Sequence, residues 1–518
     1  MARRQWPRNS FRLAPPIDRH LPAVIPPAGK WASLDAERAA ESHGSRRVQV
    51  SADARPIFNT VQPGTMNPTE AWSGRLGFIL ATIGSAVGLG SIWKFPYELG
   101  ANGGSAFLFF YLLFLVLIVV PLMLAEMAIG RRGRGDPATS IAAVAAEHGA
   151  GRRWAVFGVL GVVTSFLILS FYSVIGGWTI RYALHTAWNG LPPLAPRAAQ
   201  AEFDAFLATP AEMAGYHALF MALTAVVVAR GVSGGIERAV RLLMPALFVL
   251  MAGLAAYGVI EGDVPATLRF LLRLDPAQLT ARTALEALGL GFFSIGVGLG
   301  LMITYAAYSG VEVDLTRAAI ISVVADTVIS LLAGIAVFPI VFAHGLDPAS
   351  GPGLVFVTLP LAFAQMPFGL WAAVAFYVLL FIAALASAIS LLEPLVALLV
   401  RRRGWRRPRA ALIGATVCFT LGLANVLSFS TWAGWHPLGF MASFADASIF
   451  DLLDHATSNV LLPVGGMAIA LFAGRAVPSR LLVEELRLGP RGAMAMLVAL
   501  RYVVPAGILA ATLSWLAG

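Results

Sequence analysis

The sequence predicts an all-α integral membrane protein with about eleven transmembrane helices, most of them in two inverted repeats of five. Three observations predict this class. The 518 residues are 58% hydrophobic and only 13% charged, which is unusual for a soluble domain of this size. Apolar runs of roughly 20 residues recur along the chain, which is the length a helix needs to cross the hydrocarbon core. A glycine-rich segment of the first run returns in the sixth.

The apolar runs give the order of the spans. They do not alternate in the way that the short strands of a membrane β-barrel would, so each is expected to be helical. We place the eleven spans near residues 74–97, 105–130, 155–186, 214–231, 238–260, 285–308, 317–343, 367–400, 410–428, 448–474 and 494–516.

The arginines predict the orientation. The formal charge of +9 comes mostly from arginines in the N-terminal 70 residues and in short gaps between runs, such as 131–134, 152–153 and 401–409. Loops rich in arginine stay on the cytoplasmic side, so the pattern indicates a cytoplasmic N-terminus, an external C-terminus and a location in the cell (inner) membrane. The same pattern argues against a nucleic-acid partner.

The domain organisation is simple. Residues 1–70 are rich in Arg, Pro, Ala and Ser, and we expect a disordered cytoplasmic extension there. Residues 71–518 form one membrane domain. Its first part, 71–308, contains the first repeat and the start of the second, and its second part, 309–518, contains the remainder of the second repeat and the eleventh span. We expect the first 65 residues to be dispensable for function, and a start of translation at Met66 stays open.

The repeated glycine-rich segment is the most informative feature. The segment from Ala86 to Gly90 returns as the segment from Gly296 to Gly300, five spans later, and an odd number of spans per repeat inverts the second copy. Glycine costs about 1 kcal/mol in a helix interior, so glycines at alternate positions favour local unwinding. These glycines are Gly84, Gly88, Gly90, Gly296, Gly298 and Gly300. The alternative is that they only allow close helix packing.

Unwound backbone at membrane depth suggests a ligand site. Free carbonyls can hold a cation, and the N-terminus of a half-helix can hold a carboxylate. A sodium ion would bind to the free carbonyls, and the carboxylate of an amino acid beside it would bind to the helix N-terminus. The lone cysteine, Cys418, and eight scattered histidines give no metal cluster or nucleophile–base pair, so the pattern does not favour an enzyme.

Several motifs then identify a family. The stretch from Trp72 through GSAVGLGSIWKFP and NGGSAF, followed by PLMLAEMAIGR, FYSVIGGW, FFSIGVGLG, ITYAAY and SAISLLEP, resembles the neurotransmitter:sodium symporter family, and closely its bacterial amino-acid members with the leucine-transporter fold. The resemblance runs from about Trp72 to the end of the chain. It implies unwound first and sixth helices around a central site.

The resemblance implies two sodium sites. The first falls on the Ala86 carbonyl, Ser91, Ser294 and Asp326, completed by the substrate carboxylate. The second falls on the carbonyls of Gly84, Val87 and Ala383 and on the Ser387 hydroxyl. Two positions depart from the family: Ser91 replaces the usual Asn, and Ala386 replaces a hydroxyl or carboxylate. The second site therefore lacks one ligand. Water could replace this ligand, or the site could bind sodium more weakly, and both alternatives stay open. The number of sodium ions per transport cycle stays open for the same reason.

The resemblance also implies the substrate contacts. The Leu89 and Gly90 amides and the Tyr172 hydroxyl would hold the carboxylate, and oxygens of Ala86, Phe293 and Ser294 the ammonium. Gly88 stands where monoamine carriers have an aspartate, which favours an α-amino acid. The side-chain pocket would consist of Ile168, Phe293, Gly296, Leu299, Ser387 and Leu391. Because this pocket is apolar and Gly296 enlarges it, we expect a bulky apolar substrate, and Gly296→Phe should abolish its transport.

Charged residues at the two ends suggest gates. The resemblance pairs Lys94 with Asp454 on the outside, with lysine in place of the commoner arginine and hence a looser pair. Inside, Thr69 and Arg401 stand where the family has arginine and aspartate, so the usual pair cannot form; a reversed pair of Glu70 with Arg401 is one possibility. Glu126 lies in a long apolar run, where a carboxylate is costly, and the resemblance makes it a support for unwound backbone.

The sequence thus predicts a sodium-coupled symporter of hydrophobic L-amino acids that works by alternating access. Chloride should not be needed, because Asp326 stands where chloride-dependent members have a neutral Asn and Ser330 where they bind the anion. Two alternatives stay open: proton or mixed coupling, and an amino-acid sensor or leak pathway with a transporter-like fold. The exact amino acid, proton countertransport and the oligomeric state are not determined by the sequence.

Overall fold

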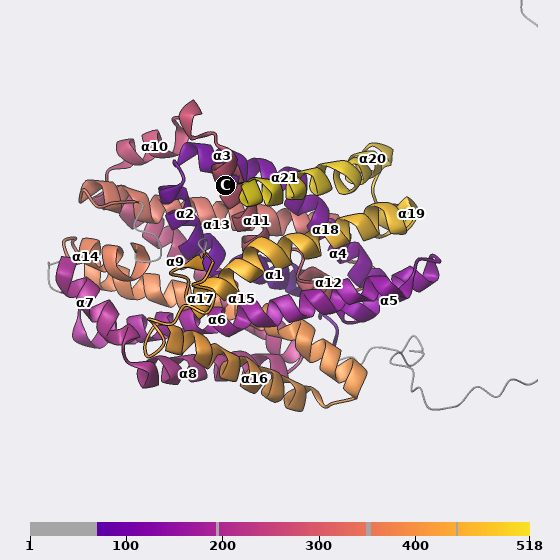
Figure 1. Cartoon of the computed structure of the whole chain (residues 1–518), viewed down its shortest axis with the longest axis horizontal. Coiled ribbons are helices and arrows are strands. Elements are labelled where there is room, and N and C mark those ends of the chain that lie inside the picture. The colour runs from indigo at the N-terminus through magenta and orange to yellow at the C-terminus, as the bar shows by residue number, and fades with distance from the viewer. Residues whose placement is uncertain (1–69, 193–195, 349–353, 442–443, 518) are drawn as a thin grey trace, which may run out of the picture. The chain divides into compact units, whose positions relative to one another are not determined.

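The computed structural model describes residues 70–192, 196–348, 354–441 and 444–517 (Figure 1). The predicted N-terminal extension and Thr69 lie outside these residues. Within them, nine helices are long and apolar enough to cross a membrane, and one bent helix pair adds a tenth. The sixth predicted span, near 285–308, is not among these ten because it is broken into two short helices.

The first five spans follow the predicted order with boundaries shifted by a few residues. They are the bent pair α1 (Arg75–Ala86) with η2 (Gly90–Lys94) and α2 (Phe95–Ala101), then α3 (Ser105–Phe114) to α4 (Val120–Gly133), α6 (Ala155–Asn189), α8 (Pro210–Ala229), and η5 (Val232–Glu237) with α9 (Arg238–Glu261). The segment η3 (Leu115–Val119) joins α3 to α4 as a π-helical turn. The sequence of each span is apolar almost throughout, as helices that contact lipid on one side and protein on the other require.

The second half repeats the pattern. The broken pair α11 (Ala281–Ile295) and α12 (Leu301–Ala307) comes first, followed by α13 (Leu315–Ala343), α15 (Gly369–Arg403), α16 (Arg407–Ser428) and the span that joins α17 (Ile449–His455), η9 (Ala456–Leu461), α18 (Leu462–Leu471) and η10 (Phe472–Ala476). The eleventh span joins α20 (Pro490–Val498), η11 (Ala499–Val503) and α21 (Val504–Ala517). Both halves therefore begin with an interrupted helix, and each interruption contains the echoed glycines.

Short helices cover the two ends of the bundle (Figure 1). α5 (Pro137–Glu147) and α19 (Ser479–Leu486) lie at the end that carries the arginines of the predicted cytoplasmic gaps, and we call it the arginine-rich end. α7 (Pro196–Leu207), α10 (Val264–Leu272) and α14 (Leu359–Phe363) lie at the opposite end. Inside the bundle, α6 packs lengthwise against α15, and α1 packs against α9, α13 and α15. The last six residues of α1, from Ala81 to Ala86, are thus buried within the protein.

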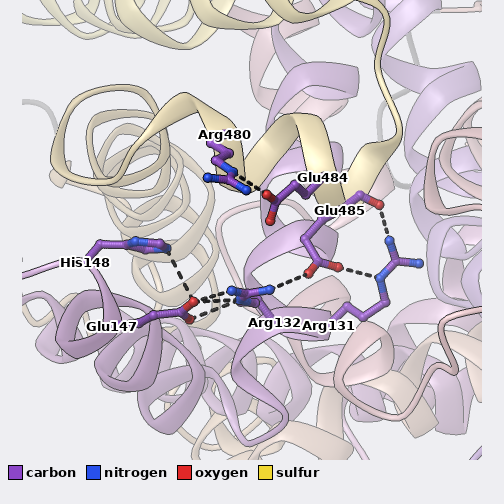
Figure 2. A network of polar contacts seen from close by, with 7 residues as sticks. All are labelled: Arg131, Arg132, Glu147, His148, Arg480, Glu484 and Glu485. Atoms are coloured by element: carbon purple, nitrogen blue, oxygen red, sulfur yellow. Dashed lines mark hydrogen bonds and ion pairs between the residues drawn. The ribbon is translucent and has the colours of Figure 1, made fainter. Parts of the chain in front are cut away.

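A polar network ties the covering helices of the arginine-rich end together (Figure 2). Arg131, at the end of α4, donates to Glu485 of α19 from Nε at 2.6 Å and to the Val313 carbonyl at 2.6 Å. Its neighbour Arg132 pairs with Glu147 of α5, and the Arg132 guanidinium lowers the pKa of the Glu147 carboxyl below its usual value. The network joins α4, α5 and α19 around the segment that leads into α13.

Candidate functional site

The first interruption is shorter than the glycine pattern predicts. α1 continues through Gly84 to Ala86, and the chain is extended at Val87 (φ −76°, ψ 106°) before a π-helical turn begins at Gly90. A side chain added at Gly84 would meet the Val240 and Met244 side chains of α9 at 3.2–3.3 Å. The expected unwinding at Gly84 is therefore wrong, and this glycine serves close packing, which was the alternative reading of the glycines.

The second interruption depends on glycine directly. Gly296, Gly298 and Gly300 have φ values of 72°, 88° and 73°, a region that other residues rarely adopt. A side chain at Gly298 would also meet the Leu462 carbonyl at 2.7 Å. Glu126 holds this segment, because its Oε1 accepts a hydrogen bond from the Gly298 amide at 2.6 Å. The position of Glu126 matches its expected role as a support of unwound backbone.

One buried carboxylate lies between the two interruptions. Asp326 of α13 has no exposed surface, and it accepts hydrogen bonds from three hydroxyl groups. Ser91 donates to Oδ1, Ser294 lies 3.0 Å from Oδ1, and the Tyr111 hydroxyl lies 3.2 Å from Oδ2. The structure thus brings together three residues of the predicted first sodium site. Tyr111 is an addition that the sequence reasoning missed.

This cluster fits a cation. Two serine oxygens and two carboxylate oxygens converge there, and oxygen is the ligand that hard cations prefer. Among the residues hydrogen-bonded to Asp326, none is cationic. A buried carboxylate with only neutral partners carries a large desolvation cost, which a bound cation would offset.

A second oxygen cluster lies near Ser387 of α15. Its Oγ lies 3.3 Å from the Val87 carbonyl and 3.5 Å from the Gly84 carbonyl, on the other side of the first interruption. Ala383 lies one helical turn earlier on the same face of α15. The neighbour Ala386 is buried and supplies no side-chain oxygen. The Ser387 hydroxyl and the Val87 and Gly84 carbonyls, three of the four groups of the predicted second site, therefore lie next to one another. The Ala386 side chain cannot supply the ligand that is missing from this site.

A small cavity, of about 30 Å³, lies beside both clusters. Most of the predicted pocket residues line it, together with four that were not predicted for the pocket. The predicted ones are Gly90, Ile168, Tyr172, Phe293, Ser294, Gly296, Leu299, Ser387 and Leu391, and the others are Ser85, Gly88, Leu301 and Ser390. Ala86 and Leu89 do not line the cavity with their side chains. This does not conflict with the prediction, which assigns backbone groups to them.

Tyr172 reaches across the cavity from α6 to the first interruption. Its hydroxyl accepts a hydrogen bond from the Leu89 amide at 3.2 Å. A side chain added at Gly88 would meet this hydroxyl at 3.0 Å and the Ser387 Oγ at 2.3 Å. A side chain at position 88 would therefore displace the Ser387 hydroxyl, and the Leu89 amide and Tyr172 hydroxyl, which were expected to bind a carboxylate, lie side by side.

The expected ion pair of Lys94 with Asp454 is formed. Lys94 Nζ lies 3.5 Å from Asp454 Oδ2 and 4.8 Å from the centre of the Phe293 ring, which borders the cavity. Asp454 also accepts a hydrogen bond from Ser458 at 3.0 Å. The pair therefore lies next to the cavity, beside Phe293.

The reversed inner pair of Glu70 with Arg401, which the sequence left open as one possibility, is not formed. Glu70 and Arg401 make no ion pair with each other in the described structure; Arg401 instead donates to the Arg134 carbonyl at 2.7 Å. A different pair lies at this end. Glu393 of α15, with no exposed surface, pairs with Arg407 of α16 and accepts from the Tyr308 hydroxyl at 2.8 Å.

The Glu393–Arg407 pair lies between the cavity and the arginine-rich end of α15. Glu393 lies two residues beyond Leu391, which lines the cavity, and Tyr308 follows α12 of the second interruption. The sequence carried a signal for it: Glu393 is a carboxylate within an apolar run, the same feature that drew attention to Glu126.

Comparison with known proteins shows the family of this chain. A family model described as the sodium:neurotransmitter symporter family matches residues 69–195 and 207–467. An uncharacterized sodium-dependent transporter, YhdH, of Bacillus subtilis is 36% identical over 447 residues, which cover 85% of this chain and 96% of the relative. An uncharacterized sodium-dependent transporter of Haemophilus influenzae is 32% identical over 78% of this chain and 89% of the relative.

A solved structure shows the same fold. The crystal structure of MhsT in complex with L-phenylalanine matches with a TM-score of 0.79 and 41% sequence identity, over 86% of this chain and 99% of MhsT. The family consists of transporters rather than enzymes. With two interrupted helices around a buried carboxylate and a family model that matches most of its length, the chain belongs to the sodium:neurotransmitter symporter family.

Proposed function

We propose that the protein is a sodium-coupled symporter of hydrophobic L-amino acids that does not require chloride. The observation that carries the proposal is the Asp326 carboxylate, which is fully buried among hydroxyl groups and next to an apolar cavity. A sodium ion there would compensate the charge, and the bound ion would attract the carboxylate of an amino acid. The names of the two relatives as sodium-dependent transporters support the choice of ion.

The substrate class rests on the cavity. Its walls are mostly aliphatic and aromatic, with polar groups gathered near the first interruption, an arrangement typical of small-molecule sites. The polar groups would hold the α-amino and α-carboxyl groups, and the apolar walls would contact the side chain. MhsT, which shares 41% of its residues, was solved in complex with L-phenylalanine, and this supports a large apolar side chain.

The residue roles follow from these positions. Asp326, Ser91, Ser294 and the Ala86 carbonyl would bind the first sodium ion, and Ser387 with the carbonyls of Gly84, Val87 and Ala383 would bind the second. Tyr172 with the Leu89 and Gly90 amides would bind the substrate carboxylate.

Transport would proceed by alternating opening of the two closed ends. Opening of the Lys94–Asp454 pair would admit sodium and substrate, and opening at the Glu393–Arg407 pair would release them. With the arginine-rich end on the cytoplasmic side of the cell membrane, as the distribution of arginines favours, this direction is uptake.

Proton exchange is a second possibility for the same carboxylate. When sodium leaves, Asp326 would remain buried with only hydroxyl partners, and a proton would remove its charge. Sodium import would then be coupled to proton export.

Thermal stability of the purified protein tests the substrate class. With a panel of amino acids in sodium or potassium chloride, we expect bulky apolar amino acids to raise the melting temperature in sodium only, since a ligand at 100 times its Kd stabilises by about 2.7 kcal/mol. A best ligand that is glycine or a dicarboxylic amino acid would contradict the proposed substrate class. Equal stabilisation in potassium would contradict sodium coupling.

A further inference from the structure

A second and larger cavity, of about 380 Å³, lies between the last turn of α2 and the first turns of α11. Its walls are polar almost throughout, whereas those of the substrate cavity are mostly apolar. They are formed by Glu98, Ala101, Asn102, Gln278, Thr280, Arg282, Thr283 and Glu286. Two carboxyl groups therefore face one space, which has room for a further charged group.

The Lys94 side chain lies within reach of this cavity. Glu98 follows Lys94 by four residues in a continuous helical stretch, so the two side chains lie on one face, about one turn apart. Glu286 precedes Phe293 by seven residues, or two turns of α11, and the Phe293 ring lies 4.8 Å from Lys94 Nζ. The Lys94 ammonium is attracted by Glu98 and Glu286 as well as by Asp454.

Loss of the Asp454 partner is costly for Lys94 unless another carboxylate replaces it. The Lys94 side chain is only 12% exposed, whereas that of Asp454 is 32% exposed and also accepts a hydrogen bond from Ser458. A largely buried ammonium that loses its counter-ion pays most of its desolvation cost without compensation. Lysine is suited to a change of partner, because its ammonium is a compact charge on a flexible stem and does not need the planar fork of arginine.

The cavity offers such a partner. Asn102 Nδ2 donates to Glu98 Oε2 at 2.9 Å, which fixes this carboxyl group on the wall of the cavity. Two carboxyl groups that face one cavity repel each other when both are ionised, and a cation between them removes this repulsion. Arg282 lies on the same wall but is exposed to solvent.

We propose that Lys94 exchanges partners when the substrate cavity opens at the Lys94–Asp454 pair, the end that we call the outer end. The lysine leaves Asp454 and pairs with Glu98 and Glu286 in the second cavity. The two glutamates thereby stabilise the open outer end, and they set the balance between its open and closed forms. This inference rests on the alternating opening proposed above.

Labelling of a cysteine in the substrate cavity tests the exchange. Cys418 is the one cysteine of the chain and has no exposed surface, so Ile168→Cys, on the wall of the substrate cavity, provides a single reporter. A membrane-impermeant methanethiosulfonate, added to intact cells in sodium, reaches it only through the open outer end, and mass spectrometry of the purified protein gives the labelling rate. With Glu98→Gln and Glu286→Gln together, we expect this rate to fall roughly three- to fivefold, the effect of the loss of two partly exposed ion pairs.

The same comparison in Lys94→Gln shows whether the two glutamates act through the lysine. In that background we expect Glu98→Gln with Glu286→Gln to leave the labelling rate unchanged. The matched control is Glu261→Gln, which removes a carboxylate at the end of α9 outside this cavity and should not alter the rate. The melting temperature of each purified variant verifies that it is folded.

An unchanged or faster labelling rate in the variant without the two glutamates would overturn the proposal. So would an equal decrease in the Lys94→Gln background, because the glutamates would then act without the lysine. Labelling measures the opening itself, so its outcome is separate from that of transport. A protein that shows the expected labelling but no sodium-coupled uptake would contradict the proposed function and support the exchange of partners.

Discussion

Wild-type protein in proteoliposomes is expected to take up its amino acid at the same rate when gluconate replaces chloride, and Asp326→Asn is expected to lose this uptake. The reason is the fixed charge of the Asp326 carboxylate, which is buried among Ser91, Ser294 and Tyr111 and would balance the charge of a bound sodium ion. Removal of one partner of a buried ion pair costs about 3–5 kcal/mol, so sodium affinity should fall by roughly 100-fold or more.

Chloride provides the discriminating control for this variant. In Asp326→Asn the site has the neutral amide that chloride-dependent members of the family carry at this position, and Ser330 lies one helical turn further along α13. We therefore expect chloride to restore part of the uptake of the variant while it has no effect on the wild type. A wild type that stops without chloride would contradict the assignment of Asp326 as the built-in anion.

The second large effect is expected at the arginine-rich end. Arg407→Ala leaves Glu393 without its cation in a position that has no exposed surface, so it should destabilise the protein by about 3–5 kcal/mol and abolish uptake. The double variant Glu393→Gln with Arg407→Gln removes both charges. It should recover most of the stability, because the Tyr308 hydroxyl can still donate to the amide oxygen at position 393.

Thermal melting and uptake of the wild type, Glu393→Gln, Arg407→Gln and the double variant form a double-mutant cycle that measures this coupling. The control is Arg480→Ala at the same end of the molecule (Figure 2), since Arg480 pairs with Glu484 on the surface with 86% of its side chain exposed. Such pairs contribute about 0–1 kcal/mol. If Arg407→Ala were no more harmful than Arg480→Ala, the Glu393 pair would not be a structural part of the inner closure.

Features that depend on one residue type or on hydrophobic length could be predicted from the sequence. The spans follow from apolar runs, and the second interruption follows from three glycines that all adopt positive φ. The cation site of Ser91, Ser294 and Asp326 could be predicted only from family motifs. Ser91 and Asp326 are more than 200 residues apart, and no local sequence pattern joins them.

The remaining features depend on contacts between spans. Gly84 looked like part of the interruption, but the side chains of α9 pack against it. Tyr111 reaches Asp326 from another helix, and Arg407 pairs with Glu393 across the gap between α15 and α16. The position of Arg401 in the sequence suggests a partner in a gate, but its guanidinium donates a hydrogen bond to the Arg134 carbonyl. Helix packing determines which residues become partners, and the hydropathy and spacing of a sequence do not predict how helices pack.

Uptake by purified protein in proteoliposomes under an inward sodium gradient tests the central claim most directly. The most stabilising amino acid of the panel serves as the labelled substrate, and both membrane voltage and pH are held equal across the membrane at the start. We predict accumulation above the external concentration that collapses when a sodium ionophore dissipates the gradient. Accumulation that follows a proton gradient in the absence of sodium, or sodium-dependent binding without any accumulation, would contradict sodium-coupled symport.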